Sequence, residues 1–245
     1  MDLHGNGAIK QRPSPVAFHA YQNDDQWVWA IAVAVSAALR RDLQQHPRAR
    51  LLVSGGKTPA PVFHALSQAP LEWGRVDVAL VDERWLRPDD HDSNAWLVRT
   101  HLLHDRAAAA RFEPLTRSGR SIEQAVATAN LLARQPADVV VLGMGGDGHT
   151  ASLFPGMADL DRALASPEPY VAVNAAGCPG AGSWPLRITS TPAGLAPADT
   201  RILLLRGADK RAVFERALAG HDPRELPIRM AFLLPGAPLD VYWCR

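Results

Sequence analysis

The chain has 245 residues, of which 47% are hydrophobic and 21% are charged, as in an ordinary globular protein. This composition excludes disordered, collagen-like and disulfide-scaffold classes. The 26 Lys and Arg residues nearly balance 25 Asp and Glu residues, and no run of four basic residues occurs, so we expect no binding to nucleic acid.

The cysteines and the apolar runs bear on the compartment. Cys178 and Cys244 lie far apart and form no CxxC pair, which excludes a zinc ribbon and a thioredoxin-type dithiol, and we expect both to be reduced thiols. The longest nearly apolar run, residues 30–39, is shorter than the roughly 20 residues of a membrane-spanning helix. Residues 1–15 lack the apolar stretch of a signal peptide. We therefore expect a cytoplasmic protein without membrane contact.

The first predicted elements are a long helix, a strand and a second helix. Apolar residues recur at helical spacing over residues 24–46, which predicts an amphipathic helix ended by Pro47. Residues 51–54 form a short apolar run that predicts a strand ending in a glycine turn. The following apolar positions predict a helix with Thr58 as its N-cap and Pro59 as its first residue.

The same alternation of apolar runs and helical patterns recurs along the chain. It predicts strands at residues 76–81, 138–142 and 201–207, the last followed by a helix over residues 210–219. Continuous Val and Leu runs indicate strands buried on both faces, as in a parallel sheet covered by helices. The sequence therefore predicts an α/β fold with a doubly wound, largely parallel sheet flanked by helices, as a single domain over residues 1–245.

The turn after the first predicted strand, SGGKTP, has the features of a phosphate-binding site. Gly55 and Gly56 allow the backbone to approach a ligand, the helix start at Thr58 offers unpaired N–H groups, and Lys57 adds a positive charge. The turn is not a Walker A loop, because the first glycine of that motif would fall on Leu51. A plain tight turn into a helix is an equally consistent interpretation.

A cluster of charges at residues 82–84 follows the second predicted strand. At the carboxyl end of a strand, Asp82 and Arg84 can orient a hydroxyl group or a water molecule and can bind an anion. The alternative is a solvated loop. Residues 92–94 predict an N-cap for a helix over residues 94–103, with polar groups that can also face the site.

A glycine-rich loop, LGMGGDGHT, follows the third predicted strand. Its glycines match GxGxxG, but Pro155 interrupts a long helix and Glu168 is not placed as a ribose-binding acid, so dinucleotide binding is disfavoured. We prefer a glycine-lined floor that holds Asp147 and His149 against a ligand, with His149 as general base. Taken alone, His149 would more often be a surface or packing histidine.

Two further cations lie near the end of the chain. Arg187 precedes the β-prone pair Ile188-Thr189, and Lys210 lies in a first helical turn, where the helix dipole disfavours a cation that has no anionic partner. Singly, each is more simply a surface charge. No GxSxG or HExxH motif occurs, so neither serine-nucleophile nor metal chemistry is indicated.

Together, the segments SGGKTP, VDERW, SN at residues 93–94, LGMGGDGHTASLFPG, RIT and GADK resemble the 6-phosphogluconolactonase family over about residues 50–210. The resemblance implies the fold that this family shares with the amino-sugar phosphate deaminases. It also implies hydrolysis of 6-phospho-D-glucono-1,5-lactone to 6-phospho-D-gluconate in the oxidative pentose phosphate pathway, without a metal or organic cofactor. The implied partner is a small sugar-phosphate lactone, and no obligatory protein partner is implied.

The resemblance also implies roles for individual residues. His149 takes a proton from the attacking water, Asp147 orients the imidazole, and Asp82 with Arg84 positions the ring end of the substrate. Phosphate binding by Arg84 is the alternative. The implied phosphate-binding groups are the glycine turn and two cations, namely Gly55, Gly56, Lys57, Thr58, Arg187 and Lys210.

The sequence leaves two rival functions. Amino-sugar phosphate deaminases have a GHIAFNEP-type continuation that supplies an acid, and Phe154 stands at that position here. A non-catalytic sugar-phosphate sensor is the second rival. The chain also departs from the family in having Lys57 where a small residue is usual, and in lacking a lysine just before Arg187. We therefore expect phosphate affinity to rest more on Lys57 and Lys210.

Overall fold

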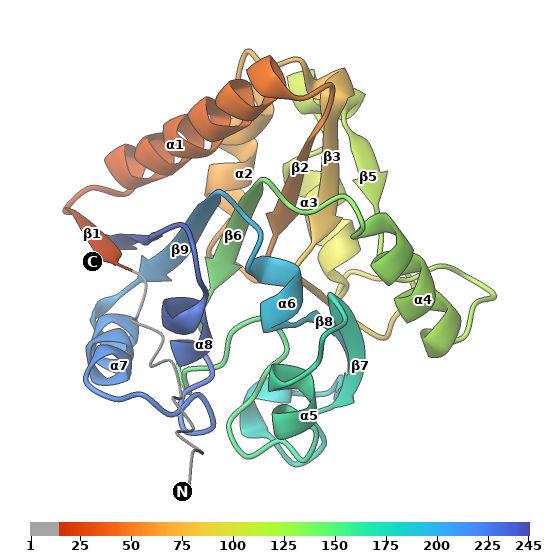
Figure 1. The fold of residues 1–245 in the computed structure, drawn as a ribbon. Coiled ribbons are helices and arrows are strands. Elements are labelled where there is room, and N and C mark those ends of the chain that lie inside the picture. Colours follow the sequence, from red (N-terminus) through yellow and green to blue (C-terminus); the bar gives the residue numbers. More distant parts are fainter. Residues whose placement is uncertain (1–14) are drawn as a thin grey trace, which may run out of the picture.

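A computed structural model describes residues 15–245 and contains a seven-stranded, entirely parallel sheet (Figure 1). Residues 1–14 lie outside the described residues. The expectation about a signal peptide falls on this segment, as does the start of the predicted domain. In spatial order, the strands are β1 (Val16–Tyr21), β10 (Leu239–Cys244), β9 (Thr200–Arg206), β6 (Val139–Gly143), β2 (Ala49–Val53), β3 (Val76–Leu80) and β5 (Arg111–Glu113).

The strand order reverses between β2 and β6. From β2 the chain moves outward through β3 to β5, then returns to β6 on the other side of β2 and moves outward through β9 to β10. In such sheets ligands bind at the carboxyl ends of the strands beside the point of reversal. The predicted doubly wound α/β fold is confirmed, and the SGGKTP and LGMGGDGHT segments leave the sheet at this point.

The helices follow the strands much as predicted. The first, α1 (Asp24–Gln45), begins where the side chain of Asn23 accepts hydrogen bonds from the backbone N–H groups of Asp25 and Gln26, and it buries one apolar face. It packs on α2 (Ala60–Ser67), which packs on α3 (Asn94–His101). The others are α4 (Ile122–Leu132), α5 (Leu160–Leu164), α6 (Pro192–Leu195), α7 (Ala208–Leu218) and α8 (Arg229–Leu233), with short 3₁₀ helices at Trp73–Arg75 (η1), Asp105–Ala109 (η2) and Pro179–Ala181 (η3).

A second sheet, not predicted from the sequence, lies beyond the carboxyl ends of β2, β3 and β6 (Figure 1). It is antiparallel, in the order β4 (Asp82–Arg84), β8 (Leu186–Ser190) and β7 (Tyr170–Asn174). The charged cluster at residues 82–84 is therefore a strand rather than a solvated loop. Because Arg84 pairs with Arg187 across β4 and β8, this sheet brings Arg187 to the ligand-binding edge of the large sheet.

Some predicted boundaries and strands need correction. The prediction of Thr58 as N-cap is wrong, because α2 begins at Ala60 and Pro59 takes the N-cap position without a side-chain hydrogen bond. The other predicted elements agree to within two residues. The sequence analysis did not predict three outer strands of the large sheet, namely β1 and β10 on one side and the three-residue β5 on the other. These strands lack the continuous Val and Leu runs of the central strands. Among residues 15–245, no helix has both the length and the apolarity needed to cross a membrane.

Candidate active site

A cavity of about 210 Å³ opens where the strand order reverses. Its wall combines the turn after β2, the loop after β6, the start of the small sheet and the first turn of α7. The lining residues include Ser54, Gly55, Gly56, Lys57, Thr58, Asp82, Arg84, Asn94, Gly145, His149, Arg187 and Lys210.

The turn after β2 is shaped by its two glycines. A Cβ atom on Gly55 would lie 1.9 Å from Oδ1 of Asn94, so only glycine permits this approach of α3. Gly56 has φ +93°, a backbone conformation that residues other than glycine rarely adopt. At the start of the turn, the Ser54 hydroxyl is buried and has no hydrogen-bond partner among the described residues, while Lys57 is exposed. The turn therefore offers the cavity a hydroxyl group and an exposed cation.

Glu83 supports the site from outside the cavity. One carboxylate oxygen accepts hydrogen bonds of 2.8 Å from the backbone N–H groups of Arg84 and Asn94, and the other accepts one of 2.8 Å from Ala95. Burial raises the pKa of Glu83 to about 7, against the opposing effect of these N–H groups. Glu83 thus ties β4 to the N-terminus of α3, where the Asn94 side-chain amide donates to the Asp82 carbonyl oxygen at 2.7 Å.

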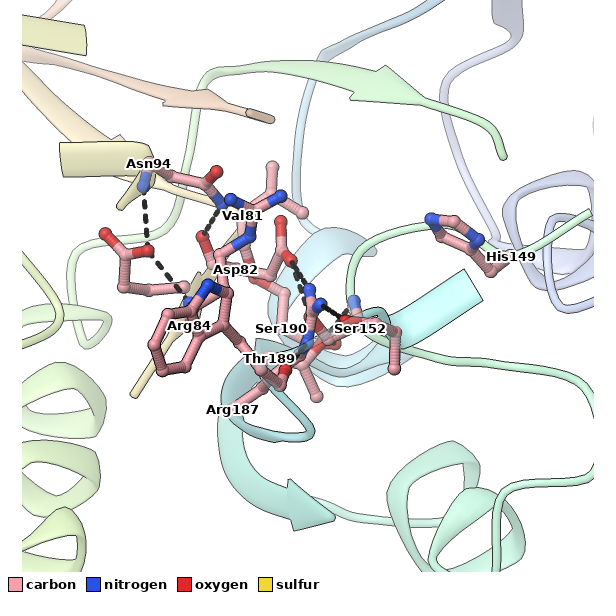
Figure 2. Close-up of polar contacts among 12 residues, drawn as sticks. Val81, Asp82, Arg84, Asn94, His149, Ser152, Arg187, Thr189 and Ser190 are labelled. Carbon is pink, nitrogen blue, oxygen red and sulfur yellow. Dashed lines mark hydrogen bonds and ion pairs between the residues drawn. The ribbon is translucent and has the colours of Figure 1, made fainter. Parts of the chain in front are cut away.

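Asp82, Ser152 and Arg187 form a buried polar cluster in the cavity wall (Figure 2). Oδ2 of Asp82 accepts a hydrogen bond of 2.6 Å from the Ser152 hydroxyl and lies 3.9 Å from a terminal nitrogen of Arg187. The same nitrogen lies 3.4 Å from the Ser152 hydroxyl oxygen. Burial lowers the pKa of Arg187, and the nearby charge of Asp82 opposes that shift. The cluster ties the loop that carries His149 to both β4 and β8.

The two arginines of the small sheet are held differently. Arg187 donates to the carbonyl oxygens of Ala181 and Trp184, at 2.7 and 2.8 Å, and its guanidinium lies 5.1 Å from the centre of the Phe154 ring. Arg84 donates to the Asp92 carbonyl oxygen, and its Nε is buried without a partner among the described residues. Arg84 therefore retains an unsatisfied donor beside the cavity.

His149 and Asp147 form a hydrogen-bonded pair on the loop after β6. Nδ1 of His149 lies 2.6 Å from Oδ1 of Asp147, which also accepts from the His149 backbone N–H at 3.1 Å. Because a carboxylate only accepts hydrogen bonds, Nδ1 carries the proton, and in the neutral ring Nε2 is left with a free lone pair. Figure 2 shows His149 apart from the cluster around Asp82. The pair can therefore act as an oriented base.

The residues around this pair fix its position. A Cβ atom on Gly145 would lie 2.2 Å from His149 Nδ1, and the imidazole packs on the Phe154 ring with centroids 4.4 Å apart. Gly148 has φ +83°. Burial raises the pKa of Asp147, but the hydrogen bond and charge of His149 outweigh burial, and the net direction is downward. Gly145 and His149 both line the cavity, and Asp147 remains an anion at neutral pH.

Lys210 brings a fourth cationic side chain, with Lys57, Arg84 and Arg187, to the cavity. It lies in the first turn of α7 and makes no ion pair within residues 15–245. Burial lowers the pKa of the Lys210 ammonium, and the charge of Asp147 opposes that shift. Asp82 is the anion that lines the same cavity, so the site favours an anionic ligand.

Comparison with known proteins identifies the relatives of the chain. Residues 22–243 match the family described as glucosamine-6-phosphate isomerases/6-phosphogluconolactonase. A 6-phosphogluconolactonase of Xylella fastidiosa is 52% identical over 226 residues, which cover 91% of this chain and 94% of the relative. One from Pseudomonas aeruginosa is 40% identical, over 94% of this chain and 96% of the relative. The chain belongs to this family.

A solved structure supports this assignment. The crystal structure of a 6-phosphogluconolactonase from Shewanella baltica aligns with a TM-score of 0.87 and 34% sequence identity, over 94% of this chain and 98% of that chain. The fold expected from the motifs is therefore the fold of the glucosamine-6-phosphate isomerase/6-phosphogluconolactonase family.

In this member of the family, the structure brings the sequence-predicted residues together. All of them line the cavity except Asp147, which is hydrogen-bonded to His149. Sequence reasoning missed Ser54 and Ser152, and it gave Asn94 only as a group that could face the site. Their signal was present, since Ser54 begins the SGGKTP segment and Ser152 lies three residues after His149. Among the described residues, no three His, Cys, Asp or Glu side chains gather as a metal site.

Proposed function

We propose that this protein hydrolyses 6-phospho-D-glucono-1,5-lactone to 6-phospho-D-gluconate, a step of the oxidative pentose phosphate pathway. The observation that carries the proposal is the oriented His149–Asp147 pair at the rim of a cavity with four cationic side chains. The Xylella fastidiosa and Pseudomonas aeruginosa relatives carry the name 6-phosphogluconolactonase, which supports the same substrate.

The phosphate is assigned to the turn after β2. Gly55 and Gly56 line the cavity, and their backbone N–H groups donate no hydrogen bond among the described residues, so they are available to an anion there. Lys57 and Lys210 supply charges without competing ion pairs among the described residues. Arg187 adds a buried charge, although two backbone carbonyls and Asp82 already engage it. We therefore assign most of the phosphate affinity to Lys57, Lys210 and the turn.

Hydrolysis needs one base and one proton donor, and His149 serves as both. Nε2 removes a proton from water while the water oxygen forms a bond to C1 of the lactone, and the carbonyl electron pair moves to its oxygen. When the tetrahedral intermediate collapses, the bond between C1 and the ring oxygen breaks, and the imidazolium returns its proton to that oxygen. Asp147 holds the ring and stabilises the imidazolium.

Asp82 and Arg84 are assigned to the ring end of the substrate. Asp82 accepts from Ser152 with one oxygen, so its other oxygen can accept from a sugar hydroxyl. Arg84 has a buried Nε without a partner among the described residues, which can donate to a sugar or carbonyl oxygen. A positioned general base accelerates the reaction by about 10²–10⁴-fold, and orientation of the lactone adds to that rate enhancement.

The rival deaminase activity has no observation in its favour. At the position where the deaminase motif supplies an acid, Phe154 is fully buried and packs on His149 and under Arg187. A carboxylate there would be needed for acid chemistry on an amino sugar. Release of ammonia from glucosamine 6-phosphate tests this rival directly, and we expect none.

The test of the proposed function is a hydrolysis assay on freshly generated lactone, with the spontaneous rate subtracted. We expect the wild-type protein to accelerate ring opening strongly and the His149→Asn protein to lose most of that acceleration. Tight binding of 6-phosphogluconate without acceleration would support the sensor and contradict the proposal.

We further propose that residues 1–245 act as one domain in the cytoplasm, without a metal or organic cofactor, nucleic acid or obligatory protein partner. The match over residues 22–243 and the single run of strands through the large sheet support the one-domain interpretation. A single cooperative unfolding transition and full activity of the purified chain after chelation would agree with these proposals. Fractionation of cells tests the compartment.

A further inference from the structure

The short helix η3 (Pro179–Ala181) lies directly against the His149–Asp147 pair. A Cβ atom on Gly180 would lie 2.4 Å from Oδ2 of Asp147 and 3.3 Å from Nδ1 of His149. The first distance is below 3.0 Å, a separation that non-bonded Cβ atoms essentially never show. Gly180, in contrast to Gly182 with φ +59°, has no positive φ that would itself require glycine. Glycine is therefore needed at position 180 for the space it leaves to Asp147.

Arg187 anchors η3 through hydrogen bonds to backbone carbonyl oxygens at and just after the helix. It donates to the carbonyl oxygen of Ala181 at 2.7 Å and to that of Trp184 at 2.8 Å. Both Arg187 and Ala181 are buried. Within the helix, the backbone N–H of Ala181 donates to the Cys178 carbonyl oxygen at 3.0 Å, so the turn is a compact unit. Its distance from Asp147 is thus set by a residue of the active-site cavity.

We propose that Gly180 is a positioning residue for catalysis, which lets η3 close over Asp147 and keeps the Asp147 carboxylate on Nδ1 of His149. This inference rests on the proposed function, because it assigns Gly180 a role through the base. Arg187 then acts on both parts of the site, since it faces the cavity and also anchors the turn that restrains Asp147.

The nature of the clash makes the role testable. The atom that a new methyl group would strike is the end of a side chain, not the backbone. The Asp147 carboxylate can rotate away from it, whereas the surrounding fold stays in place. Rotation would break the 2.6 Å contact to His149. A Gly180→Ala protein is therefore expected to fold normally and to lose the orientation of its base.

The chain offers a matched control. Gly74 is, like Gly180, an exposed glycine in the middle of a three-residue 3₁₀ helix, and a Cβ atom there meets nothing within 4 Å. We expect Gly180→Ala to lower kcat by roughly tenfold or more with little change in KM, and Gly74→Ala to change neither. Wild-type kcat in Gly180→Ala would overturn the proposal.

A double-mutant cycle tests whether the effect passes through Asp147. In an Asp147→Asn background the contact that Gly180 protects is already impaired, so Gly180→Ala should cost much less than in the wild-type background. An equal loss in both backgrounds would overturn the proposal. If Gly180→Ala does not fold, the same change combined with Asp147→Ala should fold, because the clashing carboxylate is gone. Failure of that double variant to fold would also overturn it.

A readout independent of activity separates this inference from the proposed function. The Nδ1 proton of His149, held by Asp147, should give a protected imidazole NMR signal in the wild-type and Gly74→Ala proteins and lose it in Gly180→Ala. If wild type does not hydrolyse the lactone, the proposed function fails and the NMR comparison still decides the positioning role. An unchanged signal in Gly180→Ala would contradict that role.

Discussion

Asp147 lies 2.6 Å from Nδ1 of His149, only two residues along the same loop, and this contact leaves Nε2 of the neutral imidazole unprotonated. The pair is local in sequence, but glycines from two segments make it possible. Gly145 leaves space for the imidazole and Gly180 leaves space for the carboxylate. The base of the proposed reaction is therefore oriented before substrate binds.

Removal of the imidazole should abolish most of the catalysis. We expect His149→Asn to lower kcat by about 10²–10⁴-fold because a general base contributes that much. The fold should persist, because the imidazole is partly exposed and its replacement by the smaller Asn side chain leaves no large buried cavity. Steady-state kinetics on fresh lactone and thermal unfolding check both expectations. The exposed His46 offers a control in His46→Asn, which should retain full activity. Full activity in His149→Asn would refute the assignment.

Lys57 and Lys210 should act on binding of the phosphate. We expect Lys57→Ala and Lys210→Ala each to raise KM with a smaller effect on kcat, because the phosphate keeps its charge throughout the reaction. Kinetics on an unphosphorylated gluconolactone provide the comparison, since both substitutions should hardly affect that substrate. An equal effect on the two substrates would place these lysines away from the phosphate.

The Ser152 hydroxyl should contribute to both stability and activity through its hydrogen bond to Asp82. Ser152→Ala removes the 2.6 Å donor to Asp82 and leaves that buried carboxylate short of a partner. We expect a loss of about 1–3 kcal/mol in the free energy of unfolding, together with reduced kcat. Denaturant unfolding and kinetics measure the two effects. Unchanged stability would show that Asp82 is satisfied without Ser152.

Glu83 should make stability depend on pH. Burial raises its folded-state pKa from 4.5 to about 7, so over that interval the folded protein binds the proton more tightly than the unfolded chain. This contribution to stability is fully present below pH 4.5 and is lost as the pH rises through about 7. The wild-type free energy of unfolding should therefore fall relative to that of Glu83→Gln across this interval. A difference that stays constant or rises with pH would contradict the raised pKa.

The sequence predicts the parts of the site that depend on local motifs. SGGKTP and the glycine-rich loop each follow a central strand, so parallel pairing alone brings them to one edge of the sheet. Arg187 reaches the site through a second, antiparallel sheet, which the sequence did not predict because β4 has only three residues and all are charged. Ser152 lies inside the predicted LGMGGDGHTASLFPG segment, but its partner Asp82 does not. Like the contacts of Asn94 and Gly180, this contact joins distant segments, and the motif does not show it.

The central claim is that one cavity holds the phosphate at the turn after β2 and presents the lactone carbonyl to His149. A crystal structure with the product 6-phosphogluconate bound measures this most directly. We predict that the phosphate contacts the backbone N–H groups of Gly55 and Gly56, with the C1 carboxylate within about 3 Å of His149 Nε2. A product bound with its carboxylate away from His149, or with its phosphate outside this turn, would contradict the account.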